Sequence, residues 1–103
     1  MKKLKWYFKN NYEVYSVLYE DNDFILVQND NTKLFSFGLR RDFGSFYGFP
    51  VNQSCLTFKE CKKQLNAFTE IDKSYLNTLN EFAVKNIERW QNMLTALKTS
   101  RVV

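Results

Sequence analysis

The sequence predicts an α+β protein, with a three- or four-stranded antiparallel β-meander followed by two antiparallel helices packed on one face of the sheet. Before residue 54, short β-branched and aromatic runs alternate with Asn/Asp turn signals. After Cys55, apolar residues recur every three or four positions, as in helices. No linker or repeat interrupts the 103 residues, a usual length for one domain. We therefore expect a single domain, residues 1–103, with a β-rich half at 1–54 and a two-helix half at 55–103.

Three strands are expected at residues 13–19, 24–28 and 33–38, because Asn- and Asp-rich turn signals separate them. Residues 4–9 form the fourth strand of the four-stranded alternative. Alternation sends apolar side chains to both faces of this sheet, whereas an exposed face is normally polar. Either the N-terminal segment and the loop at 39–54 cover the second face, or aromatic residues are exposed there for binding.

The first helix is expected from Phe58 to about Phe68. Thr57 and Glu60 have the spacing of a capping box, in which the two side chains satisfy free backbone donors at the helix start. Phe58, Cys61, Leu65 and Phe68 form its apolar side.

The second helix is expected to begin near Asp72 or Ser74 and to end near Lys98, which gives a length of roughly 38 Å. Its apolar stripe comprises Leu76, Leu79, Ala83, Ile87, Trp90, Leu94 and Leu97. A helix of this length could overhang a small domain, so that Trp90, Leu94 and Leu97 contact a second copy or a target protein. The alternative, favoured by the helical spacing, is that the first helix and the sheet cover the stripe.

Catalysis and cofactor binding have little support in the sequence. The chain has no His, so the commonest general base is missing, and its two cysteines do not have the spacing of a zinc site. We expect no metal, no cofactor and no enzymatic activity. The remote alternative is a reaction that uses Cys55 just ahead of a helix. The acidic pairs Glu20 with Asp21 and Glu70 with Asp72 lie where turns and helix starts favour carboxylates.

The formal charge of +4 is unevenly distributed. Four lysines lie in residues 1–12, whereas residues 13–32 hold five acidic residues and no basic one. Lys5 and Lys9 interrupt the apolar core that a signal peptide would need, and no run is long enough to cross a membrane. The expected location is the cytoplasm, without membrane contact.

The segment Leu39–Pro50, LRRDFGSFYGFP, fits neither a helix nor a strand and is the main candidate site. Its rings and arginines are the residue types that dominate protein interfaces. The predicted partner-binding residues are Arg40, Arg41, Phe43, Phe46, Tyr47 and Phe49. In the alternative interpretation, some of these rings close the core as a lid.

Basic residues form a second candidate surface, for phosphates or for an acidic protein. This set contains Lys2, Lys3, Lys5, Lys59, Lys62 and Lys63. The leading hypothesis is a non-enzymatic protein that binds a host protein or protein–nucleic acid complex, with a homodimer through the second helix as a further option. Residues with AT-rich codons are frequent, which suits an accessory protein of a phage or mobile element that inhibits a bacterial defence or nucleic-acid-handling enzyme. The alternative function is a small binder of single-stranded nucleic acid.

Overall fold

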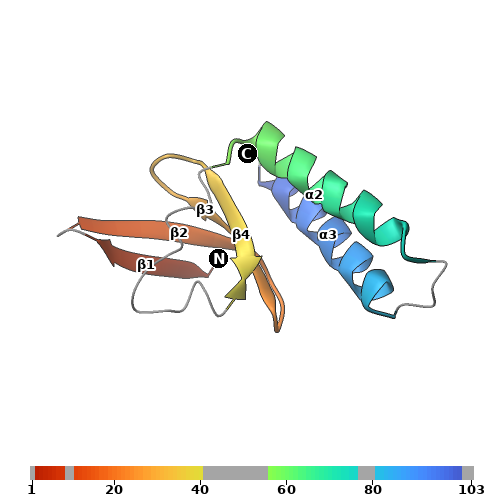
Figure 1. Ribbon diagram of the computed structural model, residues 1–103. Helices are drawn as coiled ribbons and strands as arrows, with labels where there is room; N and C mark the ends of the chain where they lie inside the picture. The colour runs from red at the N-terminus through yellow and green to blue at the C-terminus, as the bar shows by residue number, and fades with distance from the viewer. Residues whose placement is uncertain (1, 9–10, 41–55, 77–80, 101–103) are drawn as a thin grey trace. The chain divides into compact units, whose positions relative to one another are not determined.

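A computed structural model of the chain describes residues 2–8, 11–40, 56–76 and 81–100. Its elements are β1 (Lys3–Phe8), β2 (Asn11–Glu20), β3 (Phe24–Asn29), β4 (Phe35–Leu39), α2 (Phe58–Lys73) and α3 (Glu81–Thr99) (Figure 1). The chain forms two compact units, Met1–Phe58 and Lys59–Val103. The unit boundary lies close to the change in sequence pattern near Cys55.

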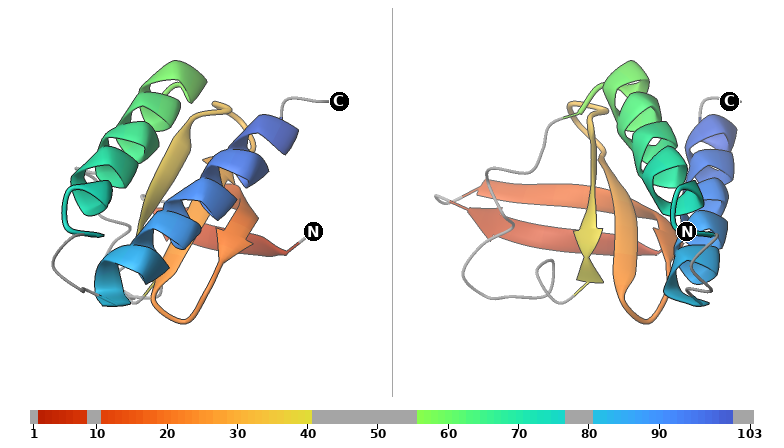
Figure 2. Two further views of the ribbon diagram at one scale, coloured as in Figure 1. Left: turned by 90° about the vertical axis from the view of Figure 1, so that its right-hand side faces the viewer. Right: turned by 45° about the vertical axis from the view of Figure 1, so that its right-hand side comes forward.

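The strands form one antiparallel sheet in the order β1-β2-β3-β4 (Figures 1 and 2). The predicted meander followed by two helices is therefore confirmed, and the fourth strand is present as β1. The packing of both helices on one face of the sheet stays a prediction.

Asn and Asp side chains shape the two turns that flank β3. After β2, Asp21 Oδ1 accepts hydrogen bonds from the backbone N–H groups of Asp23 and Phe24, at 2.8 and 2.9 Å. After β3, Asn29 Oδ1 accepts from Asn31 and Thr32 in the same way. In a turn, backbone N–H groups have no partner on a neighbouring strand, and these side-chain oxygens accept their hydrogen bonds instead. This explains why Asn and Asp are frequent in turns.

The last predicted strand begins two residues later than expected, at Phe35 instead of residue 33. Lys33 has a φ of 63°, in the left-handed region, and its N–H donates to the carbonyl of Asn29 at 2.8 Å. A residue in this conformation belongs to the turn and cannot continue a strand.

A β-bulge in β2 changes the predicted alternation of faces. Val17 pairs with Val27, but the next pair is Tyr19 with Leu26, so the register shifts at Leu18. Because paired residues share a face, Tyr15 and Val17 lie on one face while Tyr19 lies on the other. Regular alternation along the expected strand 13–19 predicts that Tyr15, Val17 and Tyr19 share a face, and this prediction is wrong for Tyr19.

The first unit has its core on the face of Tyr15, Ile25 and Val27, against which Leu4 and Val17 pack. Leu26 and Phe35 on the opposite face are also buried. The segment that follows the described gap returns to the edge of β4. There, Phe35 and Leu56 exchange backbone hydrogen bonds of 2.7 and 2.9 Å, and the ring of Phe35 meets that of Phe58 edge to face.

The bounds of the two helices differ from the prediction. α2 continues to Lys73, beyond the expected end at Phe68, and α3 begins at Glu81 instead of Asp72 or Ser74. At 19 residues α3 is roughly 28 Å long, so the predicted 38 Å helix is wrong. No Gly or Pro breaks the chain between Phe58 and Lys73. Asn80, a favoured N-cap type, precedes α3 in the sequence, although residues 77–80 lie outside the described ranges.

The second unit is a helical hairpin with α2 and α3 side by side (Figure 2). The side chains buried in it are Cys61, Leu65 and Thr69 on α2 and Ala83, Trp90, Met93 and Leu97 on α3. Of the predicted stripe, Ala83, Trp90 and Leu97 are buried, Ile87 and Leu94 are half-buried, and Leu79 lies outside the described residues. Met93 is buried in addition. Leu76, predicted as part of this stripe, lies before α3 and is exposed.

Candidate interaction surfaces

Most of the predicted aromatic loop lies outside the described residues. This applies to Arg41, Phe43, Phe46, Tyr47 and Phe49, and also to Cys55. Their roles stay predictions.

Arg40 is described, at the end of β4. Its backbone N–H donates to the carbonyl of Asp23 at 2.8 Å, and its Nε lies 3.4 Å from Oε2 of Glu20. Glu20 also forms an ion pair with Lys2, whose Nζ lies 3.0 Å from Oε1. Glu20 therefore forms ion pairs with Lys2 and Arg40, two basic residues that were predicted to contact a partner.

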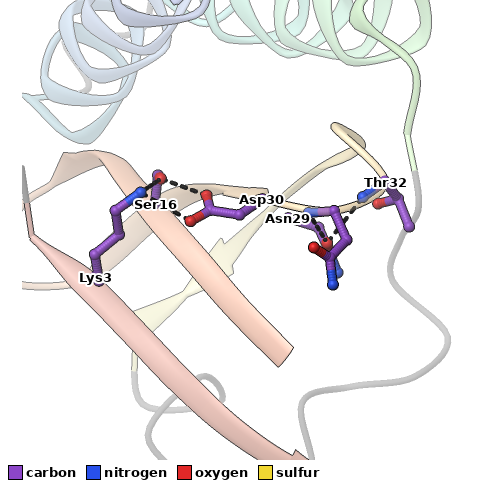
Figure 3. A network of polar contacts seen from close by, with 6 residues as sticks. Lys3, Ser16, Asn29, Asp30 and Thr32 are labelled. Carbon is purple, nitrogen blue, oxygen red and sulfur yellow. Dashed lines mark hydrogen bonds and ion pairs between the residues drawn. The ribbon is translucent and has the colours of Figure 1, made fainter. Parts of the chain in front are cut away.

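Lys3 belongs to a polar network that joins β1, β2 and the end of β3 (Figure 3). Lys3 Nζ donates to Ser16 Oγ at 2.6 Å and to Asp30 Oδ2 at 2.8 Å, while Ser16 Oγ donates to Asp30 Oδ1 at 2.6 Å. The hydrogen bonds from Lys3 and then from Ser16 lower the pKa of Asp30 below its ordinary value of 3.8. An ammonium group that donates to a carboxylate cannot also accept a serine proton, so this arrangement fixes the strands rather than activating Ser16.

The four carboxylates of the predicted acidic pairs all have structural contacts. Glu20 binds Lys2 and Arg40, and Asp21 caps the turn after β2. Glu70 forms an ion pair with Lys73 one turn later. Asp72 does not cap the second helix as expected, because it lies in the last turn of α2. Within the described ranges, no group of three His, Cys, Asp or Glu residues could hold a metal ion.

Asp72 instead binds the buried indole of Trp90. Trp90 Nε1–H donates to Asp72 Oδ2 at 2.6 Å, and the ring of Trp90 stacks on Phe68 with a centroid distance of 5.3 Å. Of the residues predicted for a helix-mediated contact, Trp90 and Leu97 are buried and Leu94 is half-buried. Both Trp90 contacts join α3 to α2 within the hairpin. A role for these three residues in contacting a partner stays a prediction.

Cys61 is the described thiol, and it is fully buried. Burial raises the pKa of Cys61 to about 12, because the apolar surroundings disfavour the thiolate. A thiol in this state is not a nucleophile at neutral pH.

Exposed apolar side chains gather in one part of the hairpin. Among the described residues, the exposed large hydrophobic side chains are Phe68, Ile71, Tyr75, Leu76, Phe82 and Val84. Phe68 and Ile71 lie on α2 with the i, i+3 spacing of one helix face, and Tyr75 lies in the turn that follows α2. Phe82, which is 77% exposed, lies in the first turn of α3. We call these four residues, Phe68, Ile71, Tyr75 and Phe82, the hairpin patch.

Sequence reasoning missed the hairpin patch as a surface. Phe68 was expected in the buried stripe of the first helix, but it is 39% exposed. The error follows from the wrong helix boundary, because ending the first helix near Phe68 leaves Ile71 outside the helix. A helix drawn through to Lys73 would have placed Ile71 on the same face as Phe68.

The lysines of the candidate basic surface fall into two groups. Lys2 and Lys3 are bound to carboxylates, whereas Lys5, Lys59, Lys62 and Lys63 are exposed and have no ion pair among the described residues.

No protein-family model matches this sequence, and neither the curated proteins nor the solved structures include a match to the chain. In the described part of the chain, no helix is both long enough and apolar enough to cross a membrane.

Proposed function

We propose that this protein is a non-enzymatic binding protein that docks on another protein through the hairpin patch. The observation that carries this proposal is the concentration of exposed large apolar side chains between residues 68 and 84. Large exposed apolar areas on soluble proteins commonly mark interaction sites. Aromatic side chains also carry much of the binding energy in protein interfaces.

The geometry of the hairpin supports a preorganised surface. Phe68 is stacked on Trp90, and Trp90 is held by Asp72, so α2 and α3 are tied together beneath the patch. A rigid helix pair loses little conformational entropy when it binds, which leaves more of the contact energy for affinity. The loop residues Arg41, Phe43, Phe46, Tyr47 and Phe49 remain proposed as further contacts.

Binding of this kind acts by occupying a surface of the partner. The proposed biological role is that of an accessory protein of a phage or mobile element. It would inhibit a host defence enzyme or a nucleic-acid-handling enzyme. The frequency of residues encoded by AT-rich codons supports only the choice of host, a low-GC bacterium.

The test is affinity capture from nuclease-treated lysate of such a bacterium with three baits: the wild type, Ile71→Asp and Val84→Asp. Ile71 and Val84 are similarly exposed, at 52% and 57%, but Val84 lies on α3 about 200° around the helix axis from Phe82 of the patch. We expect one stoichiometric protein with the wild type and with Val84→Asp, and its loss with Ile71→Asp. Equal capture by all three baits would rule out the patch as the docking site.

A further inference from the structure

One side of the N-terminal half of α2 consists only of polar residues. Lys59, Lys62, Lys63 and Asn66 have the i, i+3, i+4, i+7 spacing of a single helix face, and all four are exposed. We call this set the lysine row.

Two other lysines of the candidate basic surface are bound to carboxylates. Lys2 forms an ion pair with Glu20, which also binds Arg40, and Lys3 binds Asp30. The three lysines of the lysine row, by contrast, form no ion pair with any described residue. The lysine row therefore places three unpaired lysines next to one another on α2.

The positive charges within the lysine row repel one another. Lys59 lies three and four residues before Lys62 and Lys63, and like charges at these spacings repel on a helix surface. Lys59 also lies in the first turn, where the helix dipole is positive and favours an anion. Residues that oppose local stability are often retained for binding.

We infer that the lysine row binds the phosphate groups of a nucleic-acid backbone. Lysine is depleted in protein interfaces, whose centres are apolar, and no apolar side chain belongs to this face. Lys and Asn side chains are frequent donors to phosphates. Three lysines on one rigid helix supply the positive charge that displaces counterions from such a backbone.

This inference is independent of the proposed protein docking. Lys62 and Ile71 are nine residues apart on α2, which puts them about 180° apart around the helix axis. Lys62 and Ile71 therefore face in opposite directions, so a protein bound at Ile71 does not occupy the position of Lys62.

The experiment measures binding of the full-length protein to fluorescent single-stranded and duplex DNA by anisotropy over a series of salt concentrations. The test variant is Lys62→Gln/Lys63→Gln. Its matched control is Lys85→Gln/Lys98→Gln, which removes the same charge from exposed positions of α3. Melting temperatures of both variants establish that they are folded, and the test variant is expected to melt no lower than the wild type.

In the wild type we expect affinity to fall steeply with salt. For the test variant the slope of log Kd against log salt should be shallower by roughly 1.4 with single strands or 1.8 with duplex, because each lost phosphate contact removes about 0.7 or 0.9. The control should change the slope by less than half as much. Equal slopes in the two variants, or no DNA binding by the wild type at about 50 mM salt, would overturn the inference. Binding to polyglutamate but not to DNA would overturn it in favour of an acidic protein.

Discussion

The indole N–H of Trp90 donates a 2.6 Å hydrogen bond to the carboxylate of Asp72, across the two helices of the hairpin. The same indole stacks on Phe68, a member of the hairpin patch. The relationship thus links the buried side of α3 to the surface proposed for binding.

Replacement of Trp90 by Phe should destabilise the protein by about 1–3 kcal/mol, because a hydrogen bond to a charged acceptor is lost while most of the ring packing is kept. Urea unfolding followed by circular dichroism measures the change. Asp72→Asn retains an acceptor at the same place and should cost less than Trp90→Phe. A Trp90→Phe protein as stable as the wild type would show that the hydrogen bond does not hold the hairpin.

The network of Lys3, Ser16 and Asp30 should make stability depend on pH in the acid range. Asp30 has a lowered pKa in the folded state, so its contribution is present above the ordinary value of 3.8 and is lost as the pH falls from there through the folded pKa. In Asp30→Asn, the free energy of unfolding should fall less steeply below about pH 4. Urea titrations at several pH values test this. Parallel curves for the two proteins would contradict the network's role.

Lys33 should be replaceable by Gly with a gain in stability. Its φ of 63° is unfavourable for a residue with a Cβ, by roughly 1 kcal/mol, whereas Gly adopts it freely. Because Gly also has more freedom in the unfolded chain, the expected net gain is smaller, about 0.5 kcal/mol. Thermal unfolding of Lys33→Gly, with Lys33→Ala as the control that keeps a Cβ, measures the effect. A lower melting temperature for Lys33→Gly than for Lys33→Ala would contradict the assigned backbone conformation.

Cys61 should be almost unreactive in the folded protein. It is fully buried and burial raises its pKa to about 12, so neither access nor thiolate is available at pH 8. The measurement uses Cys55→Ser, in which Cys61 is the remaining thiol, and follows labelling by a chromogenic disulfide reagent. Labelling is expected only after addition of denaturant. Rapid labelling without denaturant would show that the core around Cys61 opens readily.

The types and order of the elements could be predicted because local signals agreed with the final structure. Asp21 and Asn29 mark turns in the sequence and cap them in the fold, and the apolar spacing around Trp90 remains helical in α3. The prediction was wrong where one residue type is compatible with two structural roles. Asp72 can cap a helix start, but here its carboxylate accepts a hydrogen bond from the indole of Trp90, 18 residues away in sequence.

The details that sequence could not supply depend on partners distant along the chain. The bulge at Leu18 is set by how β2 pairs with β3, and it moves Tyr19 to the other face without any sign in the local pattern. The ion pairs of Lys2 and Arg40 depend likewise on Glu20, which the sheet brings near both. The candidate basic surface was therefore predictable as a list of lysines, but its reduction to the lysine row required the structure.

The most direct test of the proposed function is the affinity of the captured partner for Ile71→Asp compared with Val84→Asp, measured by titration calorimetry with purified proteins. A charge placed in the apolar centre of an interface should weaken binding by roughly tenfold or more, whereas the exposed control should change it by less than about twofold. Both variants should unfold at nearly the wild-type temperature. If the two variants bind with equal affinity, the hairpin patch is not the protein-binding surface.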